Sequence, residues 1–391
     1  MASEHQHSRS SFFSISHQLI TVGEPLNYDL YINSSAVEGH EHFVKIFKKG
    51  GVLTPDDPSA FQAKYRRLYV SESQRGSYLK SLCKVAGKKE TEKSTVLKES
   101  AIQYLGTLFD PKREVTVEVL NQAMAGCRDV IEGLVDVLQG YKVDQLQDLI
   151  GKLSFHDFYT YDHSINVSMY SIVISRALNP TATREEIINA GFGGLLHDLG
   201  KIKIPTQIIN KAGKLTPEEF EEIKKHPALG HAMLSMSGLK PPPGIRVDLL
   251  LKVIYEHHEN YNGTGYPNQV AGEEIHVNAR ICAVADFFDA ITTKRSYHSA
   301  LSIDEALALM KESAGKKIDP KIFEAFTHQT KNFDFTRRPS IILPDDFDPC
   351  QPHAADAFET KRPVDWEKGI QQEPSFGRII VKPPSRRKKA A

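Results

Sequence analysis

The fold prediction starts from residues 195–201, which read LLHDLGK. Two leucines lead directly into His197 and Asp198, so an imidazole and a carboxylate follow an apolar turn. Such groups are costly to bury unless they are paired or bound to a cation. Similar side chains recur at intervals of roughly 30 residues, a separation that lets one helix run out and the next run back. They are His163, His226, the pair His257 and His258, and Asp286. We therefore expect them to meet in the core of a helical bundle.

Helix starts are marked throughout residues 153–330. Thr183, Thr216 and Ser302 are each followed three residues later by a glutamate, which is the capping-box pattern. His163 continues an apolar stripe with the residues at 167, 170 and 174, at helical spacing. Because this region has no convincing strand pattern, we predict an all-α bundle.

The seven histidine and aspartate side chains together indicate a metal site. One tetrahedral zinc ion takes four ligands, so seven nitrogen and oxygen donors suit two octahedral ions that share a carboxylate. Imidazole and carboxylate without thiolate favour iron or manganese, with zinc, nickel and cobalt left open. Two adjacent divalent ions suit displacement at phosphorus. A single buried histidine is more often a hydrogen-bonded core residue, so the prediction depends on the whole set.

The remaining sequence predicts three further regions around this bundle, in a chain of mainly α class. Strand-like runs at 28–32, 42–47 and 68–70 alternate with turn residues, which indicates a small α+β domain. Helical periodicity follows, and the chain then ends in a proline-rich stretch with a basic end. The predicted domains are residues 1–90 (α+β), 91–152 (helical linker packing on the bundle), 153–330 (bundle) and 331–391 (extended or disordered tail).

The composition limits the classes of partner that the chain can bind and the cellular compartment in which we expect it. The chain has 391 residues with 49 Lys and Arg against 49 Asp and Glu. This balance argues against binding a nucleic-acid polymer, which requires excess positive charge. No apolar run reaches the roughly 20 residues of a membrane span, and the N-terminus lacks a signal-peptide core. Four scattered cysteines fit reduced thiols. We expect a cytoplasmic protein without a membrane segment.

The motifs resemble those of the HD-GYP phosphodiesterases. They occur in the same order along about residues 150–330: YDHS at 161–164, HDLGK at 197–201, HHENYNGTGYP at 257–267, ADFFDA at 285–290 and RSY at 295–297. The resemblance implies a helical HD-domain fold that holds a metal centre. It also implies hydrolysis of cyclic di-GMP, first to the linear dinucleotide and then often to GMP.

The resemblance also assigns roles to individual residues. It implies that the metal ligands are His163, His197, Asp198, His226, His257, His258 and Asp286, with Asp198 bridging the ions. Lys201 would approach the scissile phosphate and Arg295 would bind a phosphate oxygen. Gly265, Tyr266 and Pro267 would form the loop that shapes the pocket.

The side-chain chemistry agrees with these roles. Lys201 lies one helical turn beyond Asp198, close enough to stabilise charge on a phosphate. The guanidinium of Arg295 matches a pair of phosphate oxygens, and Tyr266 offers a face for a guanine ring. Asp289, one turn beyond Asp286, could orient a ligating histidine. Plainer readings stay open: Tyr266 packs the loop, Arg295 forms a surface ion pair, and Asp289 pairs locally.

Some positions depart from the family pattern. Tyr159 stands where some members carry a glutamate that helps to hold a third metal, so we expect two divalent metal ions. Asn262, Ser296 and His298 replace the usual aspartate, proline and basic residue, which puts substrate affinity in doubt more than chemistry.

Two other functions remain open. One is a phosphodiesterase for a different cyclic dinucleotide. The other is a catalytically weak sensor of cyclic di-GMP, or an interaction module that presents the Tyr266 loop to a GGDEF or PilZ protein. The N-terminal domain could regulate the chain by sensing a ligand, dimerise it into a homo-oligomer, or dock a partner. It could also only cap the helical linker.

Overall fold

The structure is a computed structural model that describes residues 11–35, 40–85, 90–110, 114–153, 159–209, 211, 215–293, 301–330 and 348. The predicted site residue Arg295 lies outside the described residues, as do Ser296, His298 and, apart from Asp348, the predicted tail. Contacts divide the chain into two compact units: unit 1 is residues 1–100 and 129–139, and unit 2 is residues 101–128 and 140–391. Two long helices contribute to both units: α3 (Glu90–Leu108) and α4 (Val117–Val137).

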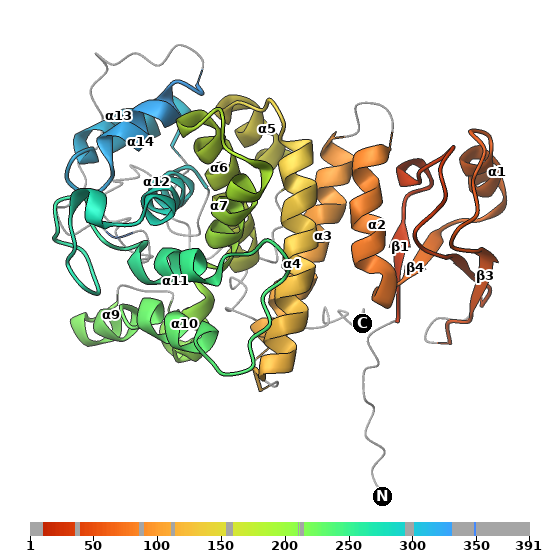
Figure 1. The fold of residues 1–391 in the computed structure, drawn as a ribbon, viewed down its shortest axis with the longest axis horizontal. Coiled ribbons are helices and arrows are strands. Elements are labelled where there is room, and N and C mark those ends of the chain that lie inside the picture. Colours follow the sequence, from red (N-terminus) through yellow and green to blue (C-terminus); the bar gives the residue numbers. More distant parts are fainter. Residues whose placement is uncertain are drawn as a thin grey trace, which may run out of the picture. The chain divides into compact units, whose positions relative to one another are not determined.

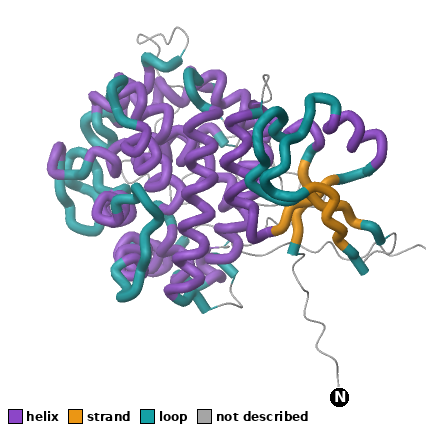
Figure 2. The backbone as a smooth tube through the Cα atoms, turned by 45° about the vertical axis from the view of Figure 1, so that its right-hand side comes forward, coloured by secondary structure: helices purple, strands orange, loops and turns teal. Residues whose placement is uncertain are grey.

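Unit 1 contains a four-stranded antiparallel sheet in the order β1-β4-β2-β3. Its strands, orange in Figure 2, are β1 (Phe12–Ile15), β2 (Leu30–Asn33), β3 (Phe43–Phe47) and β4 (Leu68–Ser71). The helices α1 (Asp57–Lys64) and α2 (Arg75–Ser81) accompany the sheet. Leu30, Leu68 and Val70 are fully buried and anchor the core of this unit.

Unit 2 is a helical bundle that contains, besides its parts of α3 and α4, the helices α5 (Val143–Leu153) and α6 (Tyr159–Leu178) (Figure 1). The helices that follow are α7 (Arg184–Leu196), α8 (Thr206–Ile209), α9 (Pro217–Ile223), α10 (His226–Leu234), α11 (Val247–Glu256), α12 (Val277–Thr292), α13 (Ile303–Ser313) and α14 (Pro320–Thr327). Helix α6 packs against α7 and α12, and α11 packs against α7, α10 and α12. The predicted class, mainly α with a small N-terminal sheet, is confirmed.

The helix starts follow from local side-chain chemistry. Thr183, Thr216 and Ser302 each accept a hydrogen bond from the backbone of the glutamate three residues on, and that glutamate accepts one in return. All three predicted capping boxes are therefore confirmed. Asp319 caps α14 in a related way, because its carboxylate accepts from two backbone N–H groups ahead of it.

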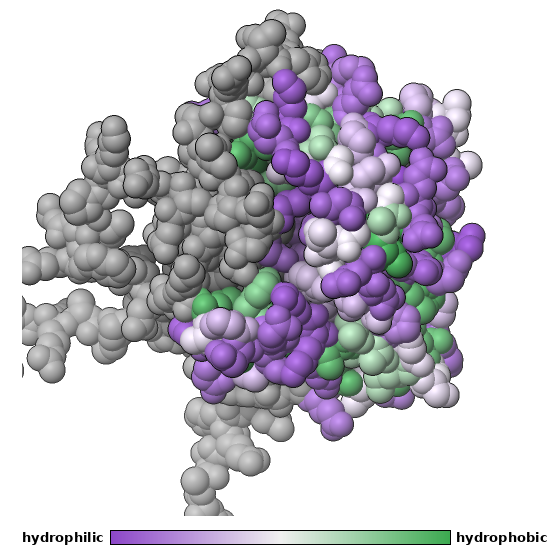
Figure 3. Space-filling model, turned by 90° about the vertical axis from the view of Figure 1, so that its left-hand side faces the viewer, coloured by the Kyte–Doolittle hydropathy of each residue, from purple (hydrophilic) through white to green (hydrophobic). Residues whose placement is uncertain are grey.

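The surface of unit 2 carries mixed side chains. On the face drawn in Figure 3, hydrophobic residues are scattered among hydrophilic ones wherever residues are coloured. None of the described helices is long and apolar enough to cross a membrane.

Candidate metal centre

The seven predicted ligands all lie in the core of unit 2, most of them in the first turns of a helix or directly after its last turn. His163 lies on α6, His197 and Asp198 follow α7, His226 opens α10, His257 and His258 follow α11, and Asp286 lies on α12. None of these residues is more than 8% exposed. Local sequence sets some of these positions: Pro227, in the first turn of α10, has no N–H to leave unpaired there. Segments far apart in sequence thus bring these side chains to one place.

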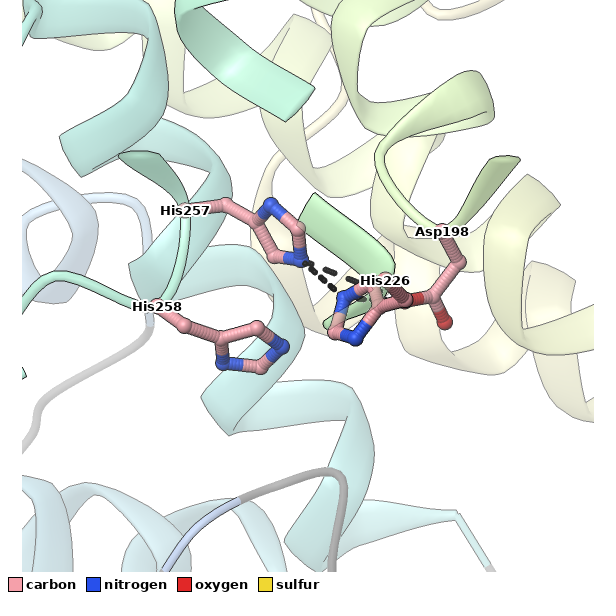
Figure 4. A group of neighbouring side chains, drawn as sticks. All are labelled: Asp198, His226, His257 and His258. Carbon is pink, nitrogen blue, oxygen red and sulfur yellow. Dashed lines mark hydrogen bonds and ion pairs between the residues drawn. The ribbon is translucent and has the colours of Figure 1, made fainter. Parts of the chain in front are cut away.

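The seven side chains form two adjoining groups. Atoms of Asp198, His226, His257 and His258 lie within 4.8 Å of one another, and so do atoms of His163, His197 and Asp286. Figure 4 shows the first group, with its three histidines facing Asp198. Each group has a composition suited to one cation, because imidazole nitrogen and carboxylate oxygen both ligate first-row transition metals.

Asp198 stands between the two groups. Its Oδ1 lies 3.4 Å from His226 Nε2 and 3.9 Å from His257 Nε2. Its Oδ2 lies 3.3 Å from His197 Nε2 and 2.6 Å from Lys201 Nζ. Burial alone would raise the pKa of Asp198, but His197 and Lys201 outweigh it and hold the pKa well below 3.8. An ionised carboxylate with one oxygen toward each group has the position that a bridging ligand requires.

Backbone carbonyls fix the orientation of three histidine rings. The Nδ1 atoms of His197, His226 and His257 lie 2.8, 2.8 and 2.9 Å from the carbonyl oxygens three residues before them. A carbonyl oxygen only accepts, so each Nδ1 must carry the proton. In a neutral ring the Nε2 lone pair then points into the cluster, which is the usual arrangement of metal-ligating histidines.

The first group concentrates lone pairs that have no proton between them. The Nε2 atoms of His226 and His257 are 3.1 Å apart. Burial holds the pKa of both rings well below 6.5, so both are neutral at pH 7 and neither Nε2 can donate to the other. Asp198 Oδ1, also buried, accepts no hydrogen bond from any described residue. Because buried acceptors without a donor are costly, this donor set fits a cation well.

In the second group, His163 lies between two carboxylates. Its Nε2 is 3.1 Å from Asp286 Oδ1 and its Nδ1 is 2.7 Å from Asp289 Oδ2. Burial would lower the pKa of His163, but hydrogen bonds to Asp286 and Asp289 raise it to about 9. Asp289 also accepts from Asn166 Nδ2 at 2.9 Å and from Thr293 Oγ1 at 2.8 Å. This carboxylate therefore orients His163, as suggested from its spacing.

We expect Asp289→Asn to weaken Mn²⁺ binding by about 10- to 100-fold, the usual effect of removing a group that orients a ligating histidine. The asparagine amide can still accept from Nδ1, but it lacks the charge that makes Nε2 a stronger ligand. Mn²⁺ titration of metal-stripped protein measures the change. Thr293→Val is the matched control, since it removes one hydrogen bond to Asp289 and leaves the carboxylate. Equal affinities for the two variants would contradict the prediction.

The loop at residues 259–270 lies beside the first group. The Tyr266 ring stacks on His258, with ring centres 4.9 Å apart and planes at 19°. One face of Tyr266 is therefore covered by a candidate ligand. Gly265 lies against the backbone of Asn260 and His258, where a Cβ would collide, and Pro267 follows Tyr266 through a cis peptide bond.

Glu259 is a residue of this site that the sequence analysis did not single out. It is 3% exposed, and its Oε1 accepts from the backbone N–H of Asn268 at 2.6 Å. Burial raises the pKa of its carboxyl group, although backbone hydrogen bonds from residues 268–270 oppose this. The Glu259 side chain thus fixes the second half of the loop that carries Tyr266, through the backbone at Asn268. Its position directly after His257 and His258 was the only feature of the sequence that could have indicated a role in this site.

Comparisons with known proteins agree with this geometry. Residues 152–322 match the model of the HD domain family. The chain is 41% identical over 176 residues to a cyclic di-GMP phosphodiesterase of Pseudomonas aeruginosa, covering 45% of this chain and 40% of that protein. It is 41% identical over 143 residues to a cyclic di-GMP phosphodiesterase response regulator of Xanthomonas campestris, covering 37% and 36%. It is 34% identical over 199 residues to a 3′3′-cGAMP-specific phosphodiesterase of Vibrio cholerae, covering 51% and 39%. The chain spans less than half the length of these curated relatives.

Proposed function

Because residues 152–322 are an HD domain that carries the HD-GYP motifs, we propose that this chain is a metal-dependent phosphodiesterase that hydrolyses cyclic di-GMP. The products are the linear dinucleotide and then GMP. Two relatives whose names include cyclic di-GMP phosphodiesterase support the substrate, each 41% identical over the aligned part.

One observation carries the proposal. His226 Nε2, His257 Nε2 and Asp198 Oδ1 converge in a buried place, and no described residue places a proton donor between them. Such a set is stabilised when a cation accepts its lone pairs. The second group adjoins it through Asp198, so the donor set favours two divalent ions, with iron and manganese preferred for imidazole and carboxylate ligands.

When bound, a pair of divalent ions supplies hydroxide at neutral pH and stabilises charge on the phosphoryl oxygens of an in-line displacement. The residues of the chain do the remaining work. Asp198 links the two groups of candidate ligands, because one of its carboxylate oxygens faces each group. Lys201 Nζ lies 2.6 Å from that carboxylate, where an ammonium can stabilise negative charge developing on phosphate. Tyr266 stands beside His258 and limits the shape of the substrate that enters.

A second cyclic dinucleotide is the main alternative substrate. The relative from Vibrio cholerae is named as specific for 3′3′-cGAMP. Both substrates offer the same scissile phosphodiester to the metal centre, and they differ only in one base. Discrimination would therefore rest on the loop around Tyr266 rather than on the seven candidate ligands. Docking of this loop to a GGDEF or PilZ protein stays a prediction.

We expect purified full-length protein to contain about two iron or manganese ions per chain and to convert cyclic di-GMP to the linear dinucleotide and GMP. Purification without oxygen, elemental analysis and chromatography of the products measure this. A parallel reaction with 3′3′-cGAMP ranks the two substrates by kcat/KM. Binding of cyclic di-GMP that survives chelation, without any turnover, would instead make the chain a sensor.

A further inference from the structure

Unit 1 contains a cleft of about 460 Å³ that plays no part in the metal site. It lies between the end of β2 and the segment that joins α1 to β4. Asn33 and Ser35 line one side, and Lys64, Tyr65, Arg66 and Arg67 line the other. The volume falls within the roughly 300–1,000 Å³ range typical of small-molecule sites.

The cleft arises because two neighbouring strands diverge. Strands β2 and β4 pair in antiparallel fashion at Tyr31 and Tyr69. Continuing that register would place Asn33 opposite Arg67, but no pairing extends that far among the described residues. Instead, Asn33 Oδ1 accepts from the backbone N–H groups of Ser35 and His42, each at 3.0 Å. The amide nitrogen of Asn33 donates to no described group, so it is free to face a ligand.

Three exposed cations line the cleft, and no described carboxylate balances their charge. Lys64, Arg66 and Arg67 form no ion pair within the part of the chain that the structure describes, and no described carboxylate lines the cleft. Four other cations of unit 1 have acidic partners: Lys45 with Asp29, Arg75 with Glu72, Lys80 with Asp129, and Lys84 with Glu24. Like charges that gather in a concave site attract an anion, and arginine forks match phosphate oxygens.

Two aromatic rings complete the lining. Tyr65 and Tyr69 are both partly exposed. Contact with Phe43, at 5.0 Å between ring centres and 71° between planes, fixes the ring of Tyr69. An aromatic side chain can stack on the flat face of a base, as in proteins that bind single strands.

We propose that this cleft binds a small nucleotide, with its phosphate at Arg66 and Arg67 and its base against a tyrosine. The ligand class follows from the combination of unpaired cations, flat rings and a volume suited to one small molecule. The site is independent of the proposed hydrolysis, because it uses no residue of the metal centre.

Calorimetric titration of the full-length Asp198→Asn variant with GMP and AMP tests the proposal, because that variant is expected to lose most of the turnover at the metal centre. We expect Arg66→Ala/Arg67→Ala, added to it, to raise the Kd of the better-bound nucleotide at least tenfold. Lys48→Ala/Lys49→Ala is the matched control, since it removes the same charge from an exposed turn of the same unit, and it should change Kd less than twofold. Tyr65→Leu should weaken nucleotide binding but not binding of inorganic phosphate.

Other results would overturn the assignment. If neither GMP nor AMP bound the Asp198→Asn protein, the cleft would not be a nucleotide site. The same would follow if the two double variants weakened nucleotide binding equally. Inorganic phosphate binding as tightly as the nucleotide would remove the role of the rings. Tighter binding of a ten-residue RNA would make a polymer the ligand. In wild-type protein, hydrolysis of cyclic di-GMP should be unchanged by Arg66→Ala/Arg67→Ala, so failure here and failure of the proposed hydrolysis are distinguishable.

Discussion

Asp198→Asn is expected to lower kcat/KM for cyclic di-GMP at least a thousandfold, which corresponds to about 4 kcal/mol of transition-state stabilisation. The asparagine has the same size, but it is neutral and offers only one acceptor oxygen. Its NH₂ group would face either His226 and His257 or His197 and Lys201. A side chain that offers an acceptor oxygen to both groups would therefore be replaced by one that offers an oxygen to only one group.

The metal content should fall together with the activity. Elemental analysis of the variant is expected to give at most one ion per chain, while circular dichroism keeps the helical signal because the bundle core is unchanged. Asp248→Asn is the control, because this exposed carboxylate pairs with Arg246 and lies outside the cluster. If Asp198→Asn kept activity within tenfold of wild type, Asp198 would not bridge the two groups.

The helical part of the fold was predictable because its signals are local. Capping boxes at Thr183, Thr216 and Ser302 involve residues only three apart, and the structure has all three. Strand β1 (Phe12–Ile15) was not predicted. It pairs with β4 (Leu68–Ser71), whose sequence lies more than 50 residues away. Its four residues, Phe-Phe-Ser-Ile, do not alternate, so only that distant partner makes the segment a strand.

The candidate site divides in the same way. The regular spacing of the histidines predicted that they would meet in the core of the bundle. The Nδ1 contacts of three of them reach only three residues back, as that of His226 does to Ile223. The anchor at Glu259 depends on how the loop returns, and Gln269 adopts φ 58° there. A positive φ is uncommon in residues other than glycine, so no local sequence pattern predicts it at a glutamine. The cleft in unit 1 likewise depends on where strands β2 and β4 stop pairing, and no local sequence pattern predicts that position.

Gly200→Ala is expected to damage the metal centre without replacing a candidate ligand. Gly200 lies in the turn Leu199–Lys203, against the backbone of α10 at His226 and Gly230. A Cβ there would overlap the carbonyl oxygen of His226, and backbone cannot rotate away as a side-chain tip can. The turn and α10 must separate, which moves His226 away from Asp198.

We expect this separation to lower the free energy of unfolding by about 1–3 kcal/mol, the usual cost of overpacking a core. Activity should fall at least a hundredfold, because ligand positions within a metal site tolerate little displacement. Gly151→Ala on α5 is the matched control: a Cβ there meets nothing within 4 Å, so stability should stay equal or rise by up to about 1 kcal/mol. Urea unfolding and Mn²⁺ titration measure both variants. A Gly200→Ala protein with wild-type Mn²⁺ affinity would mean that His226 does not need its present distance from Asp198 to hold the ion.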